Sequence, residues 1–131
     1  MSIVVGYVST KEGDAALAAA VAEARRRGNK LVVVLSRRAQ DEDPAALEAE
    51  ADTVRDRLDD ADVSYEVRQL RRGSDVADDL VSTAVEDGAE LIVIGLRRRS
   101  PVGKLILGSN AQRILLDAPC PVLAVKPEPA P

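Results

Sequence analysis

Two glycines in the last third of the chain mark the place where this sequence could bind an anion. Gly95 ends an apolar run that begins at Leu91. Gly108 comes directly before Ser109, which opens a stretch with the apolar spacing of a short helix. The first N–H groups of a helix have no partner within it, and the helix dipole adds partial positive charge at the same end. Such a cluster of backbone donors favours a phosphate group.

An arginine-rich loop joins the two glycines. It contains Arg97 to Arg99 in succession, and Gly103. Guanidinium groups match phosphate oxygens in pairs, so this loop could clamp a polyphosphate. A solvated charged loop would have the same sequence. We expect the turn from Gly108 through Ser109 to Asn110 to hold an anion or ordered water.

The spacing of these residues resembles a motif of the universal stress protein family. Nucleotide-binding members carry G-x-x-G-x9-G-[S/T] between their fourth strand and their last helix. This chain has Gly95, then Arg98 in place of the second glycine, then nine residues and Gly108-Ser109. The opening IVVGYVST, the ending APCPVLAVK and the order of elements also resemble that family. The resemblance implies a pocket for ATP or another adenine nucleotide, in functional or degenerate form.

Three residues depart from the family's pattern. Arg98 replaces a glycine that lets a phosphate approach the backbone closely, and its side chain could either block the site or donate to the phosphate. Val8 stands where the resemblance implies an aspartate at the adenine edge, and Ser36 stands where it implies an apolar wall. We therefore expect a nucleotide to bind mainly through its phosphates. The candidate nucleotide-binding residues are Tyr7, Val8, Ser9, Ser36, Gly95, Arg98, Gly103, Gly108, Ser109 and Asn110.

The composition excludes several kinds of site. The chain has no histidine and a single cysteine, which rules out His-based catalysis, an internal disulfide and a multi-Cys metal centre. No nucleophile with a neighbouring base is identifiable, so we predict no catalytic residue, no metal site and no enzyme. A slow ATPase with a loop-positioned water is the alternative. The net charge of −4 and a pI near 4.9 argue against a nucleic-acid partner.

Two further groups of residues have a structural interpretation. Cys120, between two prolines, is predicted to be a small buried side chain, because no neighbour that would activate a thiol is indicated. Asp75, Asp78 and Asp79 are predicted to be first-turn acids that interact favourably with a helix dipole. A reactive thiol and a cation site are the respective alternatives.

Alternating strand and helix patterns predict one α/β domain over residues 1–126. Ser9, Asp43, Ser74 and Ser109 are expected to be helix N-caps, and Gly28 is expected to end the first helix. The pattern indicates a three-layer sandwich around a parallel five-stranded sheet. The resemblance implies the order 3-2-1-4-5 of a Rossmann-like, adenine-nucleotide-hydrolase-like fold. The strands are expected at residues 3–8, 31–35, 63–69, 91–95 and 121–126.

The ends of the sheet bear on partners and location. Pro121 to Lys126 should be an apolar edge strand, which favours a homodimer through this strand, and residues 127–131 should be a flexible tail. No apolar run approaches the length of a membrane span, and no signal peptide is recognised, so we expect a soluble cytoplasmic protein without a membrane partner. The expected function is a regulatory or sensing domain. A protein-interaction module that binds no nucleotide is the alternative.

Overall fold

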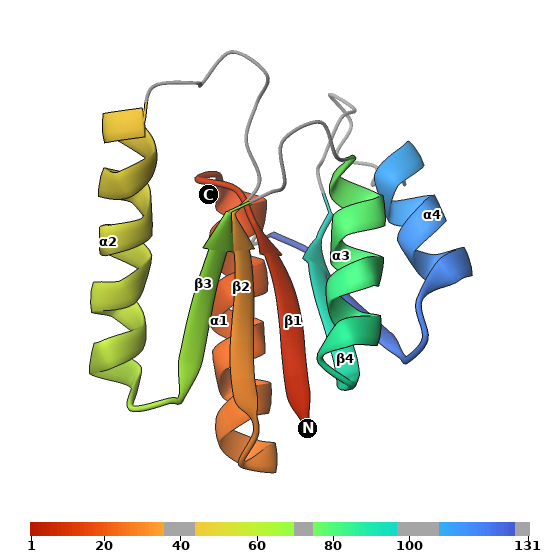
Figure 1. Ribbon diagram of the computed structural model, residues 1–131, viewed down its shortest axis with the longest axis horizontal. Helices are drawn as coiled ribbons and strands as arrows, with labels where there is room; N and C mark the ends of the chain where they lie inside the picture. The colour runs from red at the N-terminus through yellow and green to blue at the C-terminus, as the bar shows by residue number, and fades with distance from the viewer. Residues whose placement is uncertain (36–43, 70–74, 97–107, 128–131) are drawn as a thin grey trace.

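Strands and helices alternate along the chain (Figure 1) in the computed structural model, which describes residues 1–35, 44–69, 75–96 and 108–127. Each predicted strand is present, with ends within two residues of those expected. The strands are β1 (Ser2–Tyr7), β2 (Lys30–Leu35), β3 (Tyr65–Gln69), β4 (Ala89–Gly95) and β5 (Val122–Val125). The helices are α1 (Lys11–Arg27), α2 (Pro44–Ala61), α3 (Val76–Glu86) and α4 (Ser109–Asp117).

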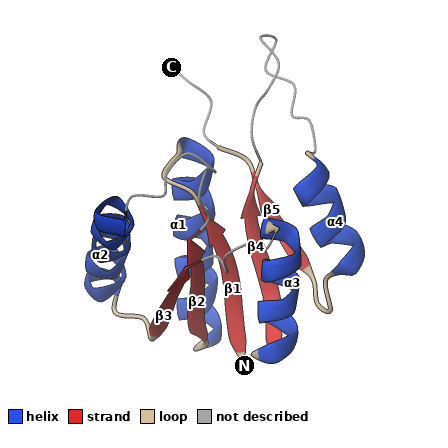
Figure 2. Ribbon diagram, turned by 45° about the horizontal axis from the view of Figure 1, so that its top comes forward, coloured by secondary structure: helices blue, strands red, loops and turns tan. Residues whose placement is uncertain are grey.

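The five strands form one parallel sheet in the order β3-β2-β1-β4-β5. Helices α1 and α2 cover one face of the sheet and α3 and α4 cover the other (Figure 2). The predicted α/β sandwich and its strand order are therefore confirmed. Because the chain moves from β1 outward to β3 and then returns to β4, the order reverses between β1 and β4.

A hydrophobic core cluster lies on each face of the sheet. Its side chains are mainly aliphatic, because the chain contains no Phe or Trp. Ile3 and Val5 of β1 pack on the side of α1 and α2, whereas Val4 packs on the side of α3 and α4. Leu17 of α1 and Leu80 of α3 are among the fully buried side chains. Both faces of β1 are thus buried, as expected for the central strand of a parallel sheet.

Three of the predicted helix N-caps are wrong by one residue, those of α1, α3 and α4. The N-cap of α1 is Thr10 rather than Ser9, and the Thr10 hydroxyl accepts a hydrogen bond from the N–H of Gly13 at 3.1 Å. The N-cap of α3 is Asp75 rather than Ser74, and its carboxylate accepts from the N–H two residues later at 2.8 Å. At α1 and α3 the next oxygen-bearing side chain along the chain caps the helix.

Other predictions at the element ends have mixed outcomes. Gly28 ends α1 in the left-handed conformation at φ 69°, as expected for a glycine at this position. Asp43 lies outside the described residues, and Pro44 is the first residue of α2. Pro127, predicted to begin a flexible tail, is buried, and residues 128–131 lie outside the described residues. Among the described helices, none has the length and apolar character needed to cross a bilayer.

Candidate nucleotide site

The candidate site lies at the carboxyl ends of β1 and β4, where the strand order reverses. The two strands are neighbours in the sheet, with Val5 opposite Val93. Val8 and Ser9 follow β1, and Gly95 is the last residue of β4. In open α/β sheets the crevice at this point is the usual ligand site. The topology therefore brings the two predicted halves of the site to the same edge of the sheet.

Two glycines let the first turn of α1 pack against these strand ends. A Cβ atom at Gly95 would lie 2.2 Å from the carbonyl oxygen of Glu12, and one at Gly13 would lie 1.7 Å from the carbonyl oxygen of Val8. No side chain can be accommodated against backbone at such distances. The close approach of α1 to β4 thus explains Gly95, which the sequence assigned to a phosphate-binding turn. Gly13 was not among the predicted residues.

The N-terminus of α4 carries the predicted anion donors. Gly108 is the N-cap, and the first hydrogen bond of the helix runs from the N–H of Gln112 to the carbonyl oxygen of Gly108 at 3.1 Å. The predicted cap, Ser109, is instead the first helical residue and is exposed, as is Asn110. Gly108 has no side chain to cap the helix, so the N-cap residue leaves the first N–H groups of α4 without the acceptor that a capping side chain would supply.

The backbone of Gly108 shows why its small size matters. Its φ of −73° and ψ of 169° are open to any residue type. The conformation therefore does not require glycine. The feature that glycine provides is the absence of a side chain of its own in front of the N–H groups of α4, and α4 has no acidic residue in its first turn to compete for them. Donors of this kind favour an anion.

Tyr7 is not part of this crevice. Its side chain is 4% exposed and packs in the core between the sheet, α1 and α2. The hydroxyl donates to the carboxylate of Asp14 at 3.0 Å, and Arg57 of α2 binds the same carboxylate at 2.9 Å. Burial, followed by the hydrogen bond to Asp14, raises the pKa of the Tyr7 hydroxyl. Tyr7 therefore connects β1, α1 and α2 and is not available to a ligand.

The remaining predicted residues divide into two groups. Val8 is half-buried, and its carbonyl oxygen accepts from the N–H of Thr10 at 2.8 Å, while Ser9 is exposed beside it. The Val8 side chain offers no hydrogen bond to a base. Ser36, Arg98 and Gly103 lie outside the described residues, as do the neighbouring arginines of that loop.

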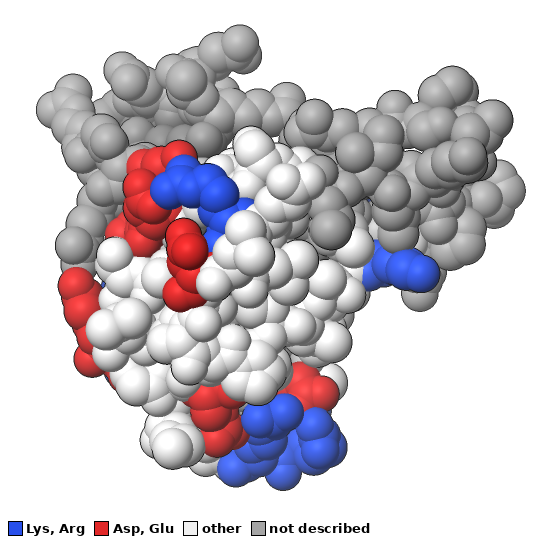
Figure 3. Space-filling model, turned by 90° about the vertical axis from the view of Figure 1, so that its right-hand side faces the viewer, with Lys and Arg blue, Asp and Glu red and all other residues white. Residues whose placement is uncertain are grey.

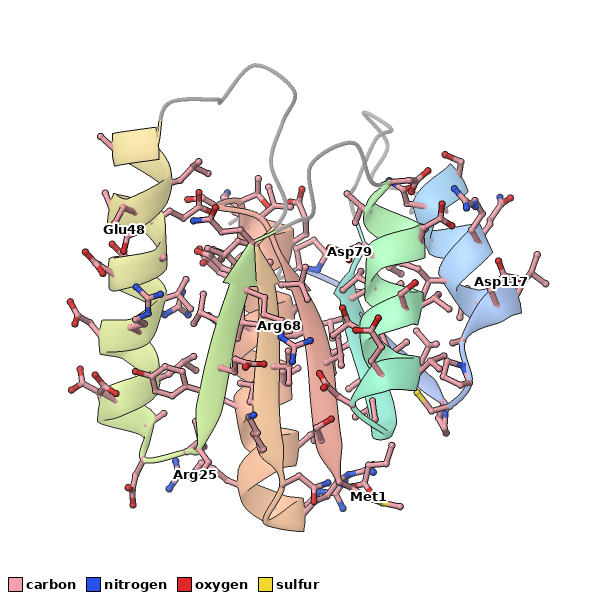
Figure 4. The ribbon with its side chains drawn as sticks, viewed as in Figure 1. Met1, Arg25, Glu48, Arg68, Asp79 and Asp117 are labelled. Carbon is pink, nitrogen blue, oxygen red and sulfur yellow. The ribbon has the colours of Figure 1, made fainter. Side chains whose placement is uncertain are left out.

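The acids of α3 have a structural function. Asp75 caps the helix, and both it and Asp78 bind the guanidinium of Arg113, with an Nη1 to Oδ2 distance of 2.5 Å for Asp75. Asp79 lies on the sheet side of α3 and is buried (Figure 4). In the described part of the chain, no three His, Cys, Asp or Glu side chains are placed to hold a metal ion. Cys120 is half-buried, and burial raises the pKa of its thiol, which lowers its reactivity.

Comparisons with known proteins identify the family of this chain. Residues 1–126 match the model of the universal stress protein family. A universal stress protein of Mycolicibacterium smegmatis is 44% identical over 127 residues, which are 95% of this chain and 97% of that protein. The structure of the universal stress protein from Archaeoglobus fulgidus in complex with dAMP is 31% identical, with a TM-score of 0.78 over 96% of this chain and 98% of that one. A universal stress protein in complex with cAMP is 25% identical, with a TM-score of 0.76 over 98% of both chains. The chain described here, over nearly its whole length, belongs to the universal stress protein family.

Proposed function

We propose that this chain is a regulatory domain that binds an adenine nucleotide, with the phosphates at the N-terminus of α4. The observation that carries the proposal is the first turn of α4 behind Gly108, where the N-cap residue makes no side-chain cap hydrogen bond. This helix follows β4 in the chain, and β4 borders the reversal point of the sheet. The dAMP and cAMP complexes of its structural relatives support the adenine nucleotide as the ligand class. We expect the domain to bind the nucleotide without hydrolysing it.

The phosphate end of the ligand should contribute most of the affinity. On the adenine side, Val8 has no hydrogen-bonding side chain, so one orienting contact to the base is lost. We therefore expect calorimetric titrations with ATP and GTP to give dissociation constants within about tenfold of each other. A preference of about a hundredfold for ATP, equivalent to about 2.7 kcal/mol, would show that another residue recognises adenine. That result would contradict the proposed division of the binding energy.

The proposed role is not catalytic. Hydrolysis of ATP would need a group that positions or deprotonates water, and a chain without histidine lacks the most common candidate. A nucleotide that stays bound suits a sensing or regulatory domain, and we place its action in the cytoplasm. A slow ATPase and an interaction module without nucleotide are the competing functions.

A homodimer through β5 is part of the proposal. The two edge strands of the sheet are β3 and β5. β3 carries Glu66 and Arg68, whose side chains form an ion pair at 2.5 Å. β5 reads Val-Leu-Ala-Val, and Leu123 is 36% exposed. Charged side chains discourage pairing with another strand, whereas an apolar edge favours it. A two-fold partner that pairs the same strand would cover β5.

We expect light scattering at micromolar concentration to give twice the 13.9 kDa mass of one chain. Leu123→Lys should shift the protein to the monomer, because it places a charge in the paired edge. Leu116→Lys, at an 83% exposed position of α4, is the matched control and should remain dimeric. A monomeric parent protein would refute the dimer.

A further inference from the structure

One arginine connects α4 to the start of α3, the other helix on the same face of the sheet. Arg113 lies in the second turn of α4, and its guanidinium binds Asp75 and Asp78 at the start of α3. Charges of both signs gather at the end of the molecule where these helices begin, beside a broad uncharged surface (Figure 3). The N–H of Ala77, and then Arg113, hold the pKa of the Asp75 carboxyl below its usual range.

Arg113 is the fifth of the nine residues of α4, so it lies in the middle of the helix, where the helix dipole has little effect on a charge. Asp117 at the end of the same helix attracts it from a distance. The two carboxylates that its guanidinium contacts directly belong to Asp75 and Asp78, at the start of α3. The direct ion pairs of Arg113 therefore join two helices.

Apolar packing also holds α4. The helix has nine residues; Ile114 is its one buried side chain, and Ala111 is partly buried against the same core cluster. Leu115 and Leu116 are 44% and 83% exposed. A helix this short is marginal without tertiary contacts. Its orientation therefore depends on Ile114 and Ala111 on the sheet side and on the Arg113 ion pairs just after its first turn.

We propose that Arg113 is a positioning residue for the nucleotide site: its ion pairs with α3 hold the first turn of α4 so that the N–H groups behind Gly108 meet the phosphates together. This inference rests on the proposed function. Arg113 need not touch the ligand, because two carboxylates already occupy its guanidinium. Exposed ion pairs contribute little to the free energy of unfolding of the whole domain. We therefore expect the loss of Arg113 to change ligand affinity and the local opening of the first turn more than global stability.

Arg113→Gln should weaken ATP binding about fivefold, since the ligand must then order the first turn itself. It should also speed amide hydrogen exchange at Gln112, whose N–H makes the first hydrogen bond of the helix. Arg55→Gln is the matched control. Arg55 also binds two carboxylates, those of Glu48 and Asp52, but all three residues belong to α2. This control should change neither ATP affinity nor exchange in α4, and Arg113→Lys should restore part of both.

The substitution Asp78→Asn distinguishes a positioning role of Arg113 from a purely electrostatic effect on ATP binding. The Asp78 side chain is 62% exposed and does not cap α3. If only electrostatics mattered, removing this negative charge would tighten ATP binding; if Arg113 positions α4, the loss of its partner should weaken binding. Tighter binding by Asp78→Asn, or unchanged exchange in Arg113→Gln, would overturn the inference. Failure of the parent protein to bind ATP would refute the proposed function, and the exchange comparison would still decide whether Arg113 fixes the first turn.

Discussion

Gly13→Ala should lower the free energy of unfolding by about 3 kcal/mol or more, although alanine is the better helix former. The added Cβ would lie 1.7 Å from the carbonyl oxygen of Val8. That oxygen also accepts from the N–H of Thr10 at 2.8 Å, so it is fixed by the backbone. Relief requires α1 to move away from the strand end, which would disturb the contact of Glu12 with Gly95. Gly95→Ala should be destabilising for the same reason.

Gly6→Ala provides the matched control for this result. A Cβ there would lie 3.0 Å from a terminal methyl carbon of Leu80, and a leucine side chain can rotate where a carbonyl cannot. Its cost should stay near 1 kcal/mol, at the low end for overpacking. Urea denaturation of the three variants measures the differences. Equal stabilities of Gly13→Ala and Gly6→Ala would show that the close approach of α1 to β1 is not tight.

The sequence predicts the elements of this fold well because its signals are local. Apolar runs of four to six residues form the buried strands, and Gly28 stops the first helix in the conformation that glycine favours. The helix starts are less well predicted. Ser9 and Thr10 both carry a hydroxyl that can cap, and the path of the chain after Val8 decides between them. At α4, the serine of the Gly108-Ser109 pair lies one residue too late to cap.

The position of the predicted site residues in the fold follows from local signals only in part. Its backbone features, such as the end of β4 and the start of α4, follow from element boundaries. The direction of a side chain depends on the alternation of the strand: Tyr7 shares the face of Ile3 and Val5, and it therefore points to α1. That pattern was available in the sequence. The ion pairs of Arg113 join two helices and have no signature in spacing, so sequence reasoning could not find them.

Gly108→Glu should abolish the phosphate affinity of the site while the fold remains intact. The backbone angles of residue 108 suit glutamate, and a carboxylate at a helix N-terminus interacts favourably with the dipole. The same carboxylate would occupy the space of the phosphate and repel it. Hydrogen bonds to charged groups are worth about 1.5–3 kcal/mol each. Losing them together should weaken ATP binding at least about a hundredfold.

Gly108→Ala separates the effect of charge from that of space. It places a methyl group in front of the N–H groups without a negative charge, so it should weaken ATP binding less than glutamate does. Urea unfolding of both variants should match that of the parent protein within about 0.5 kcal/mol, because neither residue is strained at these angles. A folded variant is the condition for interpreting its loss of affinity.

Calorimetric titration of the parent protein and Gly108→Glu with ATP tests the central claim, that the start of α4 holds the phosphates of an adenine nucleotide. We predict one ATP bound per parent chain and binding by Gly108→Glu that is at least about a hundredfold weaker. Equal affinities would mean that the phosphates bind elsewhere. Absence of binding to the parent protein at millimolar ATP would contradict the nucleotide function itself.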